Sequence, residues 1–283
     1  MSKTKKGTPI VAVMDTGINY EHEDLAGRMW NNPYLSKGLP GIHGYDFTSN
    51  NAYCMDILGH GTHCAGVIAA EADNQKGIAG ISNAQLMALK VFDTEGKTRN
   101  SDIVEALNYI IQAKQAGANI VAVNCSWGGG TSSYAMSALV HQIGVSGTLF
   151  VFAAGNDSVN HDINYYSCPY DLYQGEYAIS DNRNFIIITG ASDPNDNACS
   201  FSDYGKEDVD LFAPGDRILS TYCEDNYFPG IGSKNEAPDQ TEHFLTFDSD
   251  IECQKLYTDK DLGIPVQAKA DLRYTREKDF QED

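Results

Sequence analysis

The sequence predicts an α/β protein with a mostly parallel sheet of about seven strands between helices. Apolar runs of strand length alternate with segments of helical periodicity along most of the chain, and this alternation is typical of right-handed βαβ units. The runs are rich in β-branched residues and apolar on both faces, as in strands that helices cover on each side. Several runs end in polar residues, which predicts a site at the carboxyl edge of the sheet.

The first part of the chain contains two predicted strands and one predicted helix. Residues 9–14 form an apolar run that stops at Asp15, so this carboxylate lies at the carboxyl end of a buried strand. Residues 43–47 predict a short strand. Residues 59–70 predict a tight turn at His60 that runs into an apolar helix of small residues. A histidine held at a buried helix start suits a general base, and a core histidine with satisfied ring nitrogens is the alternative.

The middle of the chain continues this alternation of strands and helices. Residues 84–92 predict a buried strand, and Ser101 predicts the N-cap of a helix that ends at Gly117. Further strands are predicted at 120–124, 148–154, 185–189 and 209–213, with another helix at about 133–145. Because no internal repeat or long linker interrupts the pattern before about residue 222, we expect a single domain there.

Composition and charge restrict the class of protein. The chain has 283 residues, of which 42% are hydrophobic and 21% charged, and this suits one large α/β domain. Its 39 acidic and 20 basic residues give a net charge of −19, which argues against nucleic acid or an anionic membrane surface as a partner. No apolar run approaches the roughly 18 residues of a membrane span. No apolar segment of signal-peptide length follows the basic start, and the sequence leaves the cellular location undetermined.

The seven cysteines form no recognisable framework. They are odd in number and scattered, with no CxxC pair and no zinc-ligand spacing. We expect most of them to be single thiols, with one or two disulfides as the alternative. The cysteines stand at positions 54, 64, 125, 168, 199, 223 and 253.

Four short motifs follow one another in a fixed order along the chain. They are Asp15-Thr16-Gly17, Gly59-His60-Gly61-Thr62-His63, Ser126-Trp127-Gly128 and Ala153-Ala154-Gly155-Asn156. Together they resemble the subtilisin-like serine peptidases, or subtilases, over residues 9–222, and Cys64 after His63 resembles their proteinase K-like and thiol-dependent branches. The resemblance implies a three-layer α/β/α fold. It also implies hydrolysis of peptide or protein substrates through an acyl-enzyme.

The resemblance assigns three polar residues to the chemistry. Asp15 would accept a hydrogen bond from His60 and fix its tautomer. His60 would take the proton of a serine hydroxyl. Asn156 would donate to the oxyanion of the tetrahedral intermediate. The alternatives are a turn-forming aspartate at Asp15 and a loop asparagine in the left-handed conformation at Asn156.

The resemblance also assigns two walls of a substrate cleft. One wall is an edge segment that would pair with an extended peptide, and its residues are Ser126, Trp127 and Gly128. The other wall, formed by Ala153 and Gly155, would face the side chain that precedes the cleaved bond. Because these wall residues are small, we expect a pocket open to large side chains.

The sequence predicts no catalytic metal, and the resemblance implies that no cofactor is required. His60 and His63 have HxxH spacing, but they lack the glutamate of the zinc-peptidase pattern. The resemblance does imply a structural calcium position at Asp24, with residues 73–77 as its partner loop. A solvated acidic loop is the alternative at this position.

The family's nucleophile motif, Gly-Thr-Ser-Met-Ala, is absent from the sequence. Ser233 is the nearest candidate, because it follows the Ala213-Pro214-Gly215 segment at about the family's distance. The residues after Ser233 are polar, however, and do not predict the buried helix that presents the serine in the family. We therefore expect a truncated or impaired peptidase, with an inactive peptide-binding pseudoprotease as the alternative.

Residues 223–283 are set apart from the domain predicted at 9–222. They contain 15 acidic and 7 basic residues, are polar, and lack strong periodicity. We expect an acidic polar tail, and a chain that is truncated, altered or excerpted relative to the family it resembles.

Overall fold

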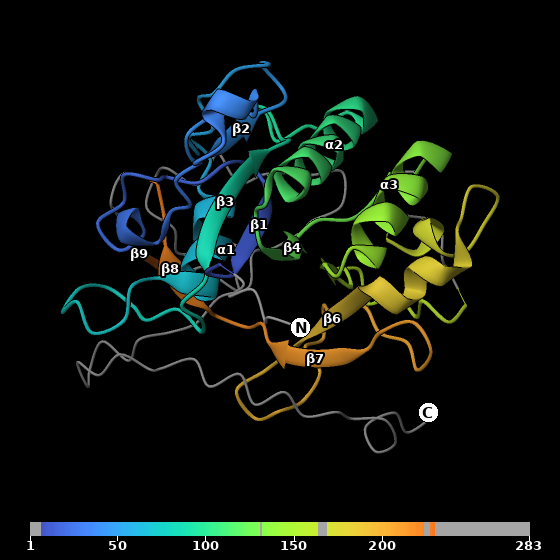
Figure 1. Ribbon diagram of the computed structural model, residues 1–283. Coiled ribbons are helices and arrows are strands. Elements are labelled where there is room, and N and C mark those ends of the chain that lie inside the picture. Colours follow the sequence, from blue (N-terminus) through green and yellow to red (C-terminus); the bar gives the residue numbers. More distant parts are fainter. Residues whose placement is uncertain (1–6, 131, 164–168, 224–226, 230–283) are drawn as a thin grey trace, which may run out of the picture.

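A parallel sheet of seven strands forms the centre of the computed structural model, as predicted (Figure 1). The structure describes residues 7–130, 132–163, 169–223 and 227–229. The strands lie in the order β2-β3-β1-β4-β5-β6-β7, and neighbouring strands are parallel throughout. Their bounds are β1 Ile10–Asp15, β2 Gly44–Asp46, β3 Gln85–Lys90, β4 Ile120–Cys125, β5 Leu149–Ala153, β6 Ile186–Ser192 and β7 Leu211–Pro214.

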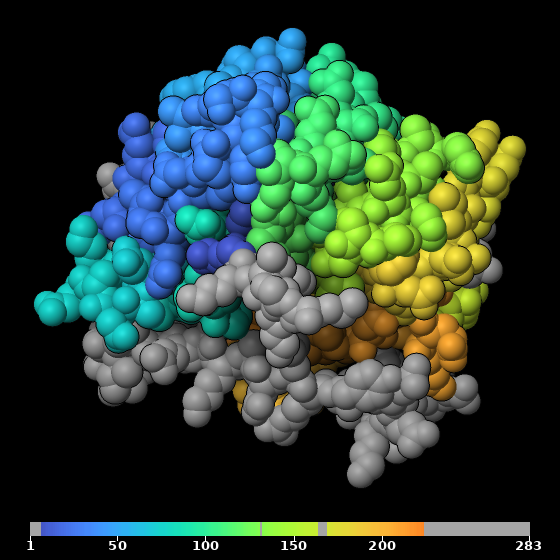
Figure 2. Space-filling view, viewed as in Figure 1, coloured from blue at the N-terminus to red at the C-terminus, as the bar shows by residue number. Residues whose placement is uncertain are grey.

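Helices cover both faces of the sheet, which confirms the predicted three layers. The helices are α1 His60–Ala69, α2 Asn100–Ala116 and α3 Tyr134–Val145. In Figure 1, α2 and α3 lie side by side on one face, and the space-filling view shows them in contact along it (Figure 2). Helix α1 packs against β1 and β3 on the other face.

The alternation of side chains along the strands produces two separate cores. In β1, the buried Ala12 and Met14 belong to the large core under α2 and α3, whereas Val13 belongs to a smaller core with Ala65 and Ala69 of α1. Successive residues of a strand point to opposite faces, so an apolar run fills both cores. Asp15 has the same parity as Val13, which places its side chain on the face that α1 covers.

The ends of the helices match the predictions in part. Helix α2 ends at the predicted Gly117, whose φ of 121° suits glycine. Its N-cap is Arg99 rather than the predicted Ser101, which lies inside the helix. The Arg99 guanidinium instead pairs with Asp102 in the first turn at 2.9 Å, a carboxylate that the helix N-terminus favours. Four short 3-10 helices complete the described helical structure: Ala26–Arg28, Leu35–Lys37, Tyr170–Leu172 and Ser180–Phe185.

A small antiparallel sheet, which the sequence analysis missed, lies beside α1. It pairs β8, Leu219–Thr221, with β9, Tyr227–Pro229, and so continues the chain past the predicted boundary at residue 222. The hydroxyls of Ser220 and Thr221 donate to the carbonyls of His63 and Thr62, both at 2.7 Å. These bonds fix the first turn of α1 to a strand that lies more than 150 positions later in the sequence.

Five of the seven cysteines lie in the described part of the chain, and three of them, Cys54, Cys125 and Cys199, are buried single thiols, as expected for most of the cysteines. Cys64 and Cys223 are half-buried. Cys168 and Cys253 lie outside the described residues, as do Ser233 and most of the predicted tail. Among the described residues, no helix has the length and apolar character needed to cross a bilayer.

Candidate active site

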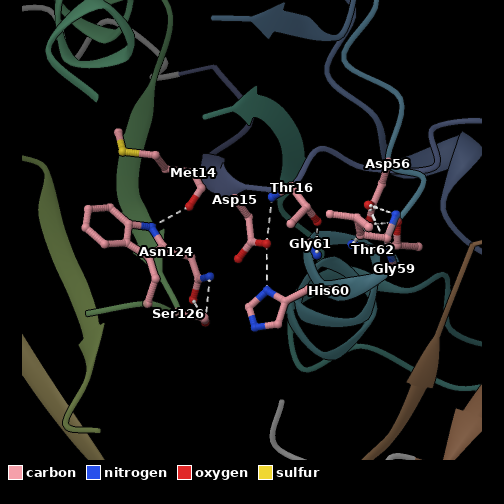
Figure 3. Close-up of polar contacts among 12 residues, drawn as sticks. Met14, Asp15, Thr16, Asp56, Gly59, His60, Gly61, Thr62, Asn124 and Ser126 are labelled. Carbon is pink, nitrogen blue, oxygen red and sulfur yellow. Dashed lines mark hydrogen bonds and ion pairs between the residues drawn. The ribbon is translucent and has the colours of Figure 1, made fainter. Parts of the chain in front are cut away.

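Asp15 and His60 form a buried pair at the carboxyl edge of the sheet (Figure 3). Asp15 is the last residue of β1 and His60 the first of α1, and their exposed fractions are 0% and 6%. Asp15 Oδ1 lies 2.6 Å from His60 Nδ1 and also accepts the Thr16 N–H at 2.7 Å. A carboxylate in this place holds the imidazole in one orientation and favours the tautomer with its proton on Nδ1.

Asp56, which the sequence analysis did not single out, fixes the start of α1. Its Oδ1 accepts the N–H groups of Leu58 and Gly59, each at 2.9 Å. Its Oδ2 accepts the backbone N–H of Thr62 at 2.9 Å and the Thr62 hydroxyl at 2.7 Å. One buried carboxylate therefore satisfies three backbone N–H groups around His60. An aspartate shortly before a predicted helix start is the signal that could have revealed it.

The turn after Asp15 packs directly on the first turn of α1. The Gly61 N–H donates to the Thr16 hydroxyl at 2.9 Å, and a Cβ at Gly61 would collide with the carbonyl oxygen of Gly17. The buried Lys90 at the end of β3 donates from Nζ to the Thr16 carbonyl at 2.5 Å. Glycine at position 61 thus permits the approach that brings the imidazole to Asp15.

Burial and charge act in opposite directions on the His60 imidazole. Burial lowers its pKa, but the negative charge of Asp15, with contributions from Cys64 and Asp56, outweighs burial and raises the pKa from 6.5 to about 10. A protonated imidazole cannot accept a proton. The capacity of the free chain for general-base chemistry therefore increases with pH through the neutral and alkaline range.

The predicted substrate edge begins where β4 ends. Ser126 and Asn124 lie on the other side of Asp15 from Thr16 (Figure 3), and the Asn124 amide donates to the Ser126 hydroxyl at 2.9 Å. The Trp127 side chain is buried and donates from Nε1 to the Met14 carbonyl at 2.7 Å. Only its backbone can therefore contribute to a peptide-pairing edge, together with the half-buried Gly128.

The second predicted wall begins where β5 ends. Ala153 is the last residue of β5, and Gly155 and Asn156 follow it; all three are half-buried. Because the sheet is parallel, these residues leave it at the same edge as Asp15 and Ser126. The structure thus brings the predicted catalytic pair, Asn156 and the two predicted walls to one edge of the sheet, whereas Ser233 lies outside the described residues.

Asp203 organises the loop that carries Asn156, and the sequence analysis missed it. Its Oδ1 accepts the N–H groups of Asp157 and Val159 at 2.8 and 2.9 Å, and its Oδ2 lies 2.8 Å from His161 Nε2. A Cβ at Gly155 would collide with the same carboxylate, and the φ of Gly155 is 121°. These contacts join positions more than 40 residues apart, which is why no local pattern revealed them.

A shorter form of the nucleophile motif does occur, as Gly130-Thr131-Ser132. It lies in the segment before α3 and so precedes Ala213-Pro214-Gly215, whereas the candidate Ser233 follows that segment. The Ser132 hydroxyl donates to the Asp171 carbonyl at 3.2 Å, and its N–H donates to the Asp171 carboxylate. Ser132 therefore anchors the substrate-edge segment to the Tyr170–Leu172 turn.

Asp24 meets the predicted partner loop. Its Oδ1 accepts from the Asn74 side-chain amide at 2.6 Å and its Oδ2 accepts from the Ile78 N–H at 3.0 Å. The Lys76 ammonium lies nearby and pairs with Glu23 at 2.9 Å. Calcium takes carboxylate and amide oxygens as ligands, and the Asp24 carboxylate and the Asn74 side chain are the groups of this kind that meet here.

Comparisons with known proteins agree with this geometry. The model of the subtilase family matches residues 6–245, past the predicted boundary at 222. Thermitase of Thermoactinomyces vulgaris is 32% identical over 229 residues, which are 81% of this chain and 70% of thermitase. A thermophilic serine proteinase of Bacillus sp. (strain AK1) is 34% identical over 229 residues, 81% of this chain and 49% of that protein. The chain thus spans about half of the second relative's length.

A solved structure of a subtilisin-like proteinase also resembles this chain. The crystal structure of a cold-adapted subtilisin-like serine proteinase superposes with a TM-score of 0.58 at 28% identity, covering 81% of this chain and 70% of that chain.

Proposed function

Because the chain belongs to the subtilase family, we propose that it hydrolyses peptide bonds as a serine endopeptidase of the subtilisin type. One observation carries the proposal: Asp15 Oδ1 lies 2.6 Å from His60 Nδ1 in a buried pair at the edge of the sheet. In the proposed reaction His60 takes the proton of a serine hydroxyl, and the serine attacks the peptide carbonyl. Asp15 stabilises the imidazolium that forms, and His60 then passes the proton to the leaving amine.

Asn156 is proposed to donate its side-chain amide to the oxyanion of the tetrahedral intermediate. Its place in the loop that Asp203 holds at the edge of the sheet supports this role. In subtilisin itself, loss of such a side-chain donor costs about 2.7–4 kcal/mol of transition-state stabilisation. Ser126, Gly128, Ala153 and Gly155 are proposed to line the cleft for an extended peptide.

The nucleophile is the residue to identify first. Ser233 is the sequence candidate and lies outside the described residues. We would treat the full chain with a fluorophosphonate and locate the modified residue by mass spectrometry. Modification of Ser233 that disappears in His60→Ala is the expected result. A folded chain that remains unmodified at every serine over the alkaline range would contradict the proposed hydrolysis.

An inactive peptide-binding protein is the second candidate function. The absence of Gly-Thr-Ser-Met-Ala from the whole sequence favours it, because the cleft walls can be retained without a nucleophile. Fluorescence polarisation with a labelled peptide distinguishes the two functions. Binding without turnover that is equal in the parent and in His60→Ala would support the peptide-binding function.

We also propose that the partners are peptides or proteins alone. The net charge of −19 supports this, because it disfavours phosphate backbones and anionic lipid surfaces at physiological salt.

A further inference from the structure

Lys90 is a buried lysine that takes no part in the chemistry proposed above. It is the last residue of β3, and its exposed fraction is 5%. Lysine is almost never buried so completely without a partner, because the ammonium group loses its hydration. Among the described residues this ammonium has one hydrogen-bond acceptor, the Thr16 carbonyl oxygen at 2.5 Å. An apolar side chain would fill the same place at lower cost, so packing alone does not account for a lysine here.

Thr16, which accepts this bond, is joined to both halves of the Asp15–His60 pair. Its backbone N–H donates to Asp15 Oδ1 at 2.7 Å. Its hydroxyl accepts the N–H of Gly61, which follows His60 in the first turn of α1, at 2.9 Å. The bond from Lys90 holds the carbonyl of the same residue. The N–H, the hydroxyl and the carbonyl of Thr16 are therefore all fixed, each by a different part of the chain.

The strand register places Lys90 between two buried carboxylates. Lys90 lies opposite Asp15 on β1 and opposite Asp46 on β2, whose exposed fractions are 0% and 4%. Residues opposite one another on neighbouring strands face the same side of the sheet, which here is the side that α1 covers. Neither carboxylate forms an ion pair with the ammonium. The positive charge of Lys90 therefore offsets part of the repulsion between the two carboxylates at longer range.

The Cys54 thiol lies where both kinds of charge act. Burial raises its pKa to about 12, the negative charge of Asp46 adds to this rise, and the positive charge of Lys90 opposes it. The Cys54 carbonyl accepts the Ile18 N–H at 3.1 Å, so this segment borders the turn that follows Asp15. The charge of Lys90 thus acts beside the turn that Thr16 forms.

We propose that Lys90 is a positioning residue for the Asp15–His60 pair. Its bond to the Thr16 carbonyl fixes the turn, and the fixed turn directs the N–H toward Asp15 and the hydroxyl toward α1. Hydrogen bonds from ionised donors are stronger than neutral ones, which suits a bond that holds a turn. Without Lys90 the turn can move, and the imidazole loses its fixed orientation toward the carboxylate. Only the consequence for hydrolysis rests on the proposed function.

The test compares Lys90→Met, Lys90→Arg and Lys114→Met in the full chain. Methionine keeps the approximate length of the side chain and removes its charge and its donors, whereas arginine keeps both. Lys114→Met is the matched control. Lys114 is a half-buried lysine that also donates to a backbone carbonyl, that of Ile120 at 3.0 Å, at the opposite end of the sheet.

Hydrogen exchange followed by NMR gives the first measurement. In Lys90→Met we expect the Thr16 and Gly61 amide protons, and the proton between Asp15 and His60, to exchange at least about tenfold faster than in the parent. Rates are divided by those of β5 amides in the same variant, so that a general loss of stability cancels. Lys90→Arg should restore most of the protection, and Lys114→Met should leave the three protons at the parental rate. Parental rates in Lys90→Met, or equal acceleration in Lys114→Met, would overturn the proposal.

A second measurement uses the unmodified chain and does not depend on the folding of any variant. With ¹⁵N in the lysine side chains, the Lys90 ammonium should give a signal in slow exchange with water, because it is buried and hydrogen-bonded. Lys97, whose side chain is 74% exposed, serves as the internal reference for fast exchange. A Lys90 ammonium that exchanges as fast as that of Lys97 would likewise contradict the proposal.

Hydrolysis gives a third measurement. In Lys90→Met we expect kcat to fall at least about tenfold while KM stays near the parental value, since the substrate cleft is untouched. An equal loss in Lys114→Met would assign the effect to stability and count against a positioning role. A chain that hydrolyses nothing in any form contradicts the proposed function instead, and the two NMR measurements still decide the role of Lys90.

Discussion

At His60 the negative charge of Asp15 prevails over burial, and this makes the stability of the fold depend on pH. The pKa of His60 is raised from 6.5 to about 10 in the folded chain. A raised pKa means that the folded state holds the proton more tightly than the unfolded state. The resulting stabilisation is complete below about pH 6.5 and is lost as the pH rises toward 10.

We therefore expect the free energy of unfolding to fall between pH 6.5 and 10, by at most about 5 kcal/mol at 1.36 kcal/mol per unit. Urea unfolding at several pH values measures this slope. Asp15→Asn should flatten it, because burial alone lowers the pKa of the imidazole. A slope that is equal in the parent and in Asp15→Asn would refute the assignment to this pair.

Asp56 gives a second prediction at the scale of one residue. Asp56→Ala leaves three backbone N–H groups and the Thr62 hydroxyl without their acceptor. We expect a loss of about 2–4 kcal/mol in the free energy of unfolding, since each unsatisfied buried group costs about 1–3 kcal/mol and water replaces part of the loss. The His60 resonances in NMR spectra should also shift, because the start of α1 is released.

Asp46→Ala is the matched control for Asp56→Ala. Asp46 is buried to a similar degree and its Oδ1 accepts bonds from Thr48 and Ser49 at the end of β2. Its loss should lower stability to a similar extent while leaving the His60 resonances in place. Equal shifts in both variants would show that Asp56 has no special relation to the site.

At the scale of elements, the loop after β5 depends on a glycine that no side chain can replace. In Gly155→Ala the new methyl group meets the Asp203 carboxylate, and the backbone must also hold φ at 121°. Gly147→Ala is the control, because φ is 87° there and a Cβ at that position has no atom within 4 Å. We expect Gly147→Ala to cost about 1–2 kcal/mol from the backbone alone.

Gly155→Ala should lower the free energy of unfolding by at least about 1 kcal/mol more than Gly147→Ala, because the Asp203 carboxylate must also move to make room for the methyl group. Thermal unfolding monitored by circular dichroism measures both variants. If the two variants are equally stable, the Asp203 carboxylate can move aside, and its hydrogen bonds do not fix the Asn156 loop.

The sequence predicted well those elements that a continuous apolar run of residues defines. The runs at 9–14, 84–92 and 120–124 became β1, β3 and β4 within one or two residues, because strands covered on both faces are apolar throughout. Ser101 failed as an N-cap because the Arg99–Asp102 pair starts α2 earlier. The roles of Asp203 and β8 could not be predicted, since their partners lie far away in the sequence.

In the candidate site, too, some features could be predicted from the local sequence and others depend on residues far away in the chain. Asp15 and His60 could be predicted because each stands where a predicted strand or helix begins or ends. The buried position of the Trp127 side chain could not, because a tryptophan after a strand can face either the core or the cleft. It packs edge-on against Phe92 and Phe152, contacts that only the assembled sheet creates.

At the scale of the whole molecule, the helices that the structure describes cover the two faces of the sheet unequally. Helices α2 and α3 bury the Phe150, Ile186 and Ile188 side chains on one face. On the other face α1 covers β1 and β3. Val151 of β5 and Ile187 of β6, which pair with each other, are only half-buried. Val151 and Ile187 therefore keep part of their apolar surface exposed to solvent, and such surface favours association.

We accordingly expect the chain to self-associate as its concentration rises, as measured by sedimentation equilibrium. Ile187→Glu places a charge on the half-covered face and should weaken association while leaving the melting temperature nearly unchanged. Ile188→Glu, one residue along β6, buries a charge in the large core and should abolish cooperative unfolding, because that cost rivals a net stability of about 5–15 kcal/mol. A strict monomer that melts cooperatively above about 65 °C, near the upper value for mesophile domains, would mean that Val151 and Ile187 are sealed from water.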